Sequence, residues 1–358
     1  MRPALKAGLQ PVWRNRDTLQ IGVDPRRAVA LEGIGPAAAV ISLLDGSRDT
    51  QTVLSMARAY GVPEQAASRV LDLLALAGVL DDFPATLHRS LPDELRARLA
   101  PELATASLAY ADGDGGARTL ARRRSSYVRV HGAGRIGAGI ATLLAASGVG
   151  RVVCVDPMPV SPSDTGAGGL VLADVGTPRD EAVAGAIARI APEVTTRDAG
   201  LAPDLAVLTV LPSPDLAAAL ANAGVPHLAA RAAEAIGVVG PLVTPGRSAC
   251  LRCVDLRRSD GDTDWPKILA QATVAADLSA CDNLLACMTA TLAAAQALAF
   301  IDGAVSPVTV NGTLEVVLPA WQWRRRTWSP HSDCTCGART LPRTMAGAVP
   351  GTAQHAGD

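Results

Sequence analysis

The chain has 358 residues, a formal net charge of −1 and seven cysteines. This length is sufficient for two domains with separate cores, and the near-zero charge gives no general attraction to nucleic acid or an acidic membrane. Residues 1–13 lack the apolar region of a signal peptide, and the apolar segment 288–301 is too short for a membrane span. Because cysteines without an export signal indicate a reducing compartment, we expect a cytoplasmic protein without disulfides, nucleic acid or membrane partners.

Residues 1–85 predict a small α+β, winged-helix-like domain. The alternation of Leu19, Ile21 and Val23 predicts a half-buried strand, and Ala28–Leu31 follows a turn as the returning strand. Three short helices are expected over about 36–44, 50–61 and 63–78, and residues 79–80 return as a short wing. One face of the third helix is expected to line the core through Ala66, Val70, Leu73, Leu74 and Ala77.

Winged helices often bind DNA, but the charge of this domain argues against that role. From residue 36 to residue 82 the chain has three basic and six acidic residues. Contact with phosphates requires the opposite balance. A groove for a protein or peptide is therefore the favoured interpretation.

Residues 86–124 are expected to form a linker, with a helix over about 92–103 and a flexible joint at 111–116. From residue 125 to residue 337, helices alternate with apolar strands, which predicts a Rossmann-like, mainly parallel, doubly wound sheet. An irregular charged loop is expected after Cys253, a long helix over 284–301, and a hairpin over 308–318 that turns at Asn311–Gly312. The tail, 338–358, has no periodicity and is expected to be disordered.

The centre of this second domain is a glycine turn between a strand and a helix. Residues 127–131 form an apolar strand, and Gly132, Gly134 and Gly137 follow in the spacing of a dinucleotide-binding turn. Asp156 ends the next strand, where such folds place a carboxylate against a ribose hydroxyl. These residues, with Arg135 inside the turn, predict a nucleotide site.

Two cysteine pairs predict a second site. Cys250 and Cys253 are separated by two residues, and Cys334 and Cys336 by one. Four thiolates form a closed, structural zinc site with no open position for chemistry. The short spacing of the second pair leaves His331 as an alternative ligand.

Cys281 and Cys287 are candidates for a different role. A cysteine after the first zinc pair could act as a nucleophile, so Cys281 is a weak catalytic candidate. Neither thiol has a neighbouring cation in the sequence that would lower its pKa. Cys287 also falls within an apolar helical pattern, which favours simple packing.

Together, the strand–turn–helix unit, the paired cysteines and the late hairpin resemble the ThiF/MoeB superfamily over about residues 125–337. The resemblance implies a homodimer that uses ATP and magnesium to adenylate the C-terminus of a ubiquitin-like protein. Several family positions differ here. Arg179 stands where a lysine is expected, residues 164–168 lack the expected arginine, and no magnesium-binding aspartate follows the strand at 205.

One branch of the superfamily fits these differences. The ThiF-like partner proteins of azoline-forming peptide pathways (TOMM, a class of RiPP) combine a winged-helix recognition element with a zinc-bearing domain that no longer binds ATP. In that group the leader peptide adds a strand beside the winged helix, and a separate YcaO-type cyclodehydratase uses ATP. The resemblance places peptide binding on Ala28, Val29, Ala30 and Leu31, with Arg69 and Leu73 as the groove wall.

The sequence thus favours a non-catalytic scaffold that presents a precursor peptide to a YcaO-type enzyme. The main alternative is an active adenylyltransferase that has rebuilt its site with Arg135, Arg179 and Asp156. A nicotinamide-dependent oxidoreductase would explain the glycine turn but not the cysteine pairs.

Overall fold

The computed structural model describes residues 1–82, 91–272 and 280–338. The chain forms two compact units. Unit 1 contains Met1–Ser126 with Leu144–Arg151 and Ile301–Ala304, and unit 2 contains the remaining segments. Most of the tail expected to be disordered, residues 339–358, lies outside the described residues.

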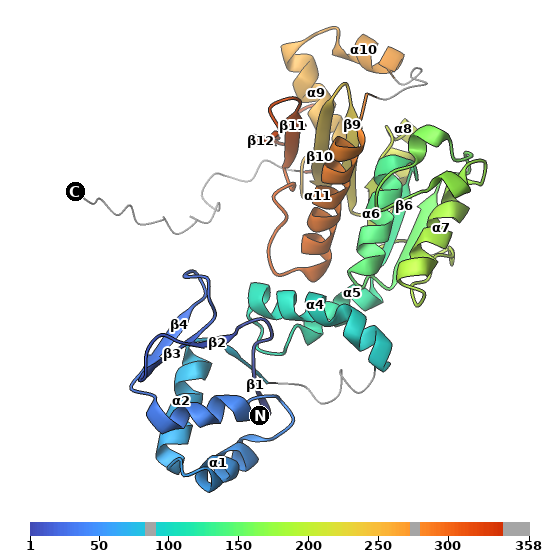
Figure 1. Cartoon of the computed structure of the whole chain (residues 1–358). Coiled ribbons are helices and arrows are strands. Elements are labelled where there is room, and N and C mark those ends of the chain that lie inside the picture. Colours follow the sequence, from blue (N-terminus) through green and yellow to red (C-terminus); the bar gives the residue numbers. More distant parts are fainter. Residues whose placement is uncertain (83–90, 273–279, 339–358) are drawn as a thin grey trace. The chain divides into compact units, whose positions relative to one another are not determined.

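Unit 1 begins with short strands and helices of the expected kinds (Figure 1). In chain order they are β1 (Pro3–Leu5), β2 (Pro11–Trp13), β3 (Thr18–Ile21), β4 (Val29–Glu32), η1 (Gly35–Leu43), α1 (Thr50–Ala59), α2 (Glu64–Leu76), β5 (Leu80–Asp82), α4 (Asp93–Tyr110) and α5 (Ala117–Ser125). The expected pairing of β3 with β4 is confirmed, and β2 completes a three-stranded sheet in the order β2-β3-β4. The first of the three helices is a 3-10 helix.

The expected wing is present, but its partner is the strand β1, which the sequence pattern did not indicate. Leu5 lies opposite Leu80 in this antiparallel pair. The buried face of α2 also differs from the prediction, because Ala67, Val70 and Leu74 are buried whereas Leu73 is 42% exposed. The spacing 67, 70, 71, 74 follows one helical face more closely than the predicted set, which mixed two adjacent faces.

A buried ion pair joins three elements of unit 1. Lys6 follows β1, and its ammonium group donates to Asp81 Oδ1 at 2.8 Å, to Ser107 Oγ at 2.9 Å and to the Ser107 carbonyl at 2.8 Å. The Ser107 hydroxyl in turn donates to Asp81 Oδ2 at 2.6 Å. All three side chains are almost fully buried. Since every ammonium hydrogen has an acceptor, the pair fixes β1 and β5 to α4 without an unsatisfied charge.

Unit 2 contains most of a seven-stranded sheet in the order β12-β11-β10-β9-β8-β6-β7. The strands are β6 (Tyr127–His131), β7 (Arg151–Val155), β8 (Leu205–Leu208), β9 (His227–Ala233), β10 (Ile236–Val243), β11 (Gly312–Val317) and β12 (Gln322–Thr327). β8 pairs in parallel with β6 and β9, whereas β9, β10, β11 and β12 are joined by antiparallel pairs. The α/β, Rossmann-like class is confirmed, but the sheet is mixed and not mainly parallel.

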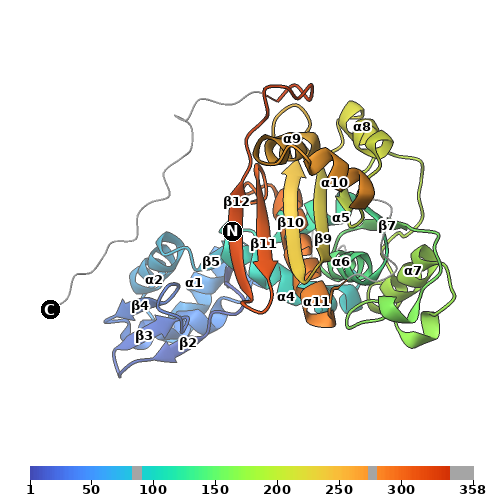
Figure 2. The same ribbon diagram turned by 90° about the horizontal axis from the view of Figure 1, so that it is seen from above.

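Helices cover both faces of this sheet (Figure 2). They are α6 (Arg135–Ala146), α7 (Arg179–Ile190), α8 (Pro214–Asn222), α9 (Leu251–Gly261), α10 (Trp265–Ala272) and α11 (Asn283–Asp302), with two 3-10 turns, η2 (Pro162–Asp164) and η3 (Leu172–Asp174). α6 and α11 lie side by side, since a β-carbon on Gly139 would lie 3.1 Å from the Ala290 β-carbon. α8 packs against Ala206 and Leu208 of β8.

Two sequence-based expectations for this region are wrong. The segment after Cys253 is helical in α9 and α10, and the hairpin is formed by β11 and β12, with its turn at residues 318–321. Asn311 does adopt the left-handed conformation, with φ of 53°. However, its side chain accepts a hydrogen bond from Ala249 N at 2.8 Å, so the Asn-Gly pair leads the chain into β11 and does not reverse it.

α11 is the one described helix that is long and apolar enough to cross a membrane by length and composition. The core helix of a soluble protein passes the same test. A β-carbon on Gly237 of β10 would lie only 2.6 Å from the Thr289 hydroxyl of α11, so the helix packs closely on the sheet. This contact is typical of a core helix.

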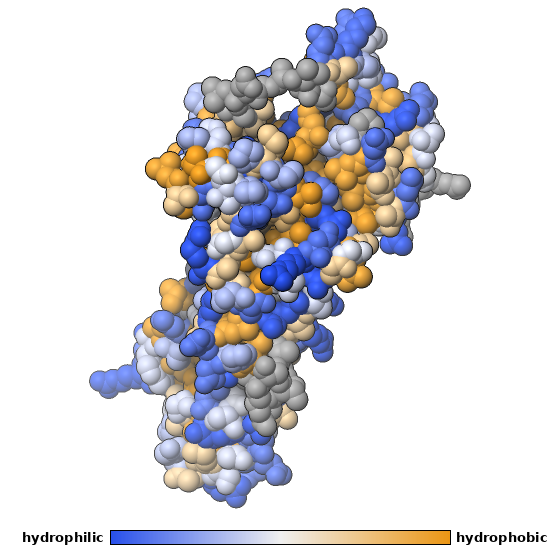
Figure 3. All heavy atoms as spheres, turned by 90° about the vertical axis from the view of Figure 1, so that its right-hand side faces the viewer, coloured by the Kyte–Doolittle hydropathy of each residue, from blue (hydrophilic) through white to orange (hydrophobic). Residues whose placement is uncertain are grey.

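Some apolar side chains of unit 2 remain at the surface, as the orange area in Figure 3 shows. The loop between β7 and α7 exposes Met158, Val171 and Leu172, the last of them at 73%. Clusters of exposed apolar side chains often mark interaction surfaces.

The buried ion pair gives a stability prediction. We expect Lys6→Met to lower the unfolding free energy of unit 1 by about 3–5 kcal/mol, because Asp81 would remain buried without its cation. Urea denaturation followed by circular dichroism measures this change. Lys267→Met is the control, since the second of the two lysines makes a mainly exposed pair with Asp264. Equal midpoints for the two variants would contradict the assignment.

Candidate functional site

The glycine turn between β6 and α6 has the close contacts that its spacing predicts. Gly132 has φ of 90°, and a β-carbon there would lie 2.5 Å from the Thr209 hydroxyl. A β-carbon on Gly137 would lie 1.9 Å from the carbonyl oxygen of Gly132. No other residue fits at these positions, because any side chain would overlap the neighbouring strand or the turn itself.

Asp156 directly follows β7 and holds the turn. Its Oδ2 accepts a hydrogen bond from Ala133 N at 2.9 Å, and its Oδ1 accepts one from Met158 N at 3.2 Å. The side chain is buried, and Arg179 Nη1 lies 3.3 Å from Oδ2. The carboxylate is therefore already paired within the chain.

Asp164, which the sequence analysis did not select, lies beside the same turn. Arg179 forms a bidentate pair with it, with Nε and Nη2 at 2.8–3.0 Å from its carboxylate oxygens. Ser161 donates to Asp164 Oδ2 through both its amide and its hydroxyl, each at 2.8 Å. A β-carbon on Gly134 would lie 3.3 Å from Asp164 Oδ1, so this carboxylate occupies space next to the glycine turn.

The electrostatics keep this ion pair charged. Burial alone would raise the pKa of Asp164, but hydrogen bonds from Ser161 and Arg179 outweigh it and hold the pKa below its ordinary value. For Arg179, burial acts to lower the pKa, and the pairing with Asp164 and Asp156 raises it overall. Asp164 and Arg179 are therefore both charged at neutral pH.

Arg135, at the start of α6, is directed to a different partner. Its Nη1 donates to the Cys281 carbonyl at 3.0 Å, while its buried Nε has no hydrogen-bond partner among the described residues. Burial raises the pKa of the Cys281 thiol, although nearby Arg135 opposes the shift. A thiol with a raised pKa is a poor nucleophile at neutral pH, so the geometry gives no support to Cys281 as a catalyst.

The other two cysteines outside the paired motifs lie on a strand and a helix of unit 2. Burial raises the pKa of Cys154, on β7, to about 12. Cys287 lies on α11, where its thiol is 3.6 Å from the Ala167 carbonyl. The helical position of Cys287 agrees with the packing role expected for it.

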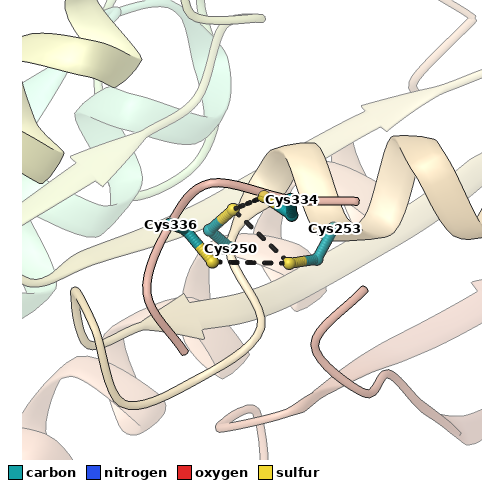
Figure 4. A group of neighbouring side chains, drawn as sticks. All are labelled: Cys250, Cys253, Cys334 and Cys336. Carbon is teal, nitrogen blue, oxygen red and sulfur yellow. Dashed lines mark hydrogen bonds between the residues drawn. The ribbon is translucent and has the colours of Figure 1, made fainter. Parts of the chain in front are cut away.

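The four paired cysteines come together in one cluster (Figure 4). Cys250 and Cys253 lie at the start of α9, and Cys334 and Cys336 lie after β12. The four sulfur atoms are all within 4.8 Å of one another, and three of the distances between them are 3.5, 3.6 and 3.7 Å. Zinc bound to four thiolates at about 2.3 Å requires sulfur–sulfur distances of about 3.8 Å, so the cluster fits this metal.

The chemistry of the cluster is also compatible with a bound cation. Burial raises the pKa of the Cys250 and Cys334 thiols, whereas burial acts to raise the pKa of Cys253 but hydrogen bonds from the His331 and Cys250 backbones lower it overall. A bound zinc ion removes this penalty and deprotonates the thiols. The prediction that a cysteine cluster could hold zinc is confirmed by the geometry.

His331 does not belong to the ligand set. Its Nε2 lies 3.2 Å from Asp260 Oδ2, and its Nδ1 accepts a hydrogen bond from Asp333 N at 3.1 Å. Its backbone amide donates to the Cys253 sulfur at 3.4 Å. His331 therefore positions the segment that carries the second cysteine pair.

The residues predicted to bind a peptide lie in unit 1. Val29, Ala30 and Leu31 belong to β4, which is an edge strand of the three-stranded sheet, and Ala28 precedes it. Arg69 lines a shallow hollow along α2 with Glu64, Gln65, Ser68 and Asp72. Leu73 continues the same face of the helix and is 42% exposed.

Metal content gives a direct prediction for the cysteine cluster. We expect about one zinc ion per chain in the purified protein and almost none in Cys334→Ser, because three thiolates hold a structural zinc ion much less firmly. Inductively coupled plasma mass spectrometry measures this. Cys287→Ser, outside the cluster, should retain the metal. Metal-free wild-type protein, purified without chelator, would contradict the assignment.

A search of protein-family models matches the ThiF family over residues 108–218. This segment contains the glycine turn, Asp156, Asp164 and Arg179. A comparison with curated protein sequences gave no match.

Solved structures agree with this family match. E. coli MccB with AMPCPP and MccA is 17% identical with a TM-score of 0.69, and the alignment covers 95% of this chain and all of that one. The microcin C7 biosynthetic enzyme MccB in complex with N-formylated MccA is 16% identical with a TM-score of 0.66, covering 94% and all. PaaA is 19% identical with a TM-score of 0.60, covering 74% and 92%. At these identities the likeness shows the fold. The chain therefore carries a ThiF family domain within a ThiF-like Rossmann fold.

Proposed function

We propose that this chain is a ThiF-like scaffold that binds a precursor peptide through its N-terminal domain and presents it to a separate, ATP-using enzyme of the YcaO type. The observation that carries the proposal is the edge strand β4, which has a neighbour on one side only, β3, among the described strands. An extended peptide can add to such an edge through backbone hydrogen bonds.

The surface of α2 supplies the selectivity that backbone pairing lacks. Leu73 offers an apolar contact, and the hollow around Arg69 contains two acidic side chains, Glu64 and Asp72. Such a wall suits a peptide with an apolar residue followed or preceded by a basic one. The alignment of nearly the whole chain with MccB, which is solved with N-formylated MccA, supports a peptide as the ligand class.

The nucleotide site supports a role without adenylation. The segment after β8 reads Thr209, Val210 and Leu211, and so lacks the acid that would hold magnesium. Arg179, in place of a lysine, is occupied by two carboxylates of the chain. Because adenylation depends on cations aimed at the phosphates, these pairings remove its main source of transition-state stabilisation.

The cysteine cluster and the exposed loop of unit 2 would serve assembly of the scaffold. A zinc ion held by the four cysteines would fix the segment after β12 to α9 as a structural support. The exposed apolar side chains of the β7–α7 loop favour a homodimer. The cysteines without an export signal favour a cytoplasmic location. The proposed working form is therefore a cytoplasmic homodimer.

An active adenylyltransferase is the second candidate. The intact glycine turn, buried Asp156 and the fold shared with MccB, which is solved with AMPCPP, favour it. Its test is ATP–pyrophosphate exchange in the presence of candidate peptides. Exchange that disappears in Asp156→Ala would establish this candidate and reject the scaffold.

Peptide binding gives the main prediction. We expect Leu73→Ser to weaken binding of a labelled candidate precursor peptide by about tenfold, because roughly 1–2 kcal/mol of apolar contact is lost. Fluorescence anisotropy measures the dissociation constant. Tyr60→Ser is the matched control, since this side chain is exposed at the end of α1.

A modified peptide tests strand addition itself. N-methylation of alternate amides should abolish binding in one of the two registers and leave it unchanged in the other, because only one set of amides faces the edge strand. Equal binding of both methylated peptides would reject strand addition.

A further inference from the structure

The position of Asp164 has a consequence for ligand selection at the glycine turn. Gly134 is the residue whose missing side chain lets a phosphate approach the backbone in dinucleotide-binding turns. In this chain Asp164 Oδ1 lies only 3.3 Å from where a β-carbon on Gly134 would be. A carboxylate and a phosphate oxygen cannot share that space.

The carboxylate is held firmly in this position. It accepts two hydrogen bonds from Ser161 and a bidentate pair from Arg179, and the side chain is 12% exposed. Asp164 ends the 3-10 turn η2, so the backbone of this turn also fixes its direction. Displacing it would break several charge-assisted hydrogen bonds at once.

The charges around the turn also oppose the binding of a phosphate. Asp156 and Asp164 contribute two negative charges and Arg179 one positive charge, which leaves an excess negative charge. Arg135 is bound to the Cys281 carbonyl. A triphosphate would therefore meet a carboxylate at the position where such turns usually offer amides and cations.

We propose that Asp164 is an internal anion that fills the phosphate position of the glycine turn, with Arg179 as its counter-ion, and thereby excludes nucleotide phosphates. The inference rests on the proposed scaffold function, in which no ATP is used. It identifies one side chain as the determinant of that exclusion.

The test compares Mg-ATP binding to the full-length wild type, Asp164→Ala and Asp174→Ala by isothermal titration calorimetry. Asp174 is a matched control, because it ends the 3-10 turn η3 and accepts a hydrogen bond from the Val171 amide, as Asp164 does from Ser161. We expect no measurable binding to the wild type or Asp174→Ala. Asp164→Ala should bind Mg-ATP at least about tenfold more tightly than the detection limit that bounds the wild type. The reason is that a like charge has been removed and Arg179 released. Adenosine, which has no phosphate, should show no such gain.

The outcomes separate the two proposals. Micromolar Mg-ATP binding to the wild type would reject the ATP-free scaffold. If the wild type does not bind and folded Asp164→Ala does not bind either, the internal-anion proposal is overturned and the scaffold stands. An equal gain for adenosine would also overturn it. Asp164→Asn, which removes the charge but keeps the shape, provides the same comparison if Asp164→Ala fails to fold by circular dichroism.

Discussion

The close approach of α6 to β6 is the constraint on which the second unit depends. The Gly132 carbonyl lies where any side chain on residue 137 would have to be, so the helix can begin directly above the strand only if that residue is glycine. Asp156 then binds the amide of Ala133 and fixes the turn to the end of β7. α11 in turn packs against α6, where Gly139 lies close to Ala290.

This constraint accounts for the glycines of the turn whether or not a nucleotide binds there. Gly132 and Gly137 are required by packing, whatever the turn binds, because a β-carbon there would meet backbone, Thr209 or Val210. Its charged residues are under no such constraint, and here Asp156 and Asp164 share a single counter-ion, Arg179. The same fold can therefore serve a scaffold in which recognition has moved to the edge strand and helix of the first unit.

The sequence predicted most elements correctly where a local pattern and a local stop signal agreed. The helices expected over about 50–61 and 63–78 form as α1 and α2. Predictions that required a partner distant in sequence were less successful. β1 was missed, because its three residues gain their stability from β5, nearly eighty residues later. The Asn311–Gly312 turn was misplaced, because its conformation depends on a hydrogen bond to Ala249.

For the candidate sites, the sequence by itself determined the residue types: the spaced glycines, the acid after β7 and the two cysteine pairs. Such motifs are readable because their chemistry imposes both identity and spacing. Only the tertiary structure decided how they combine. It brings all four thiols together, assigns His331 to Asp260, and places Asp164 against the glycine turn. No spacing rule could indicate that last contact, because Asp164 is thirty residues from Gly134 in the sequence. Its carboxylate is held there by Arg179, which lies on another helix.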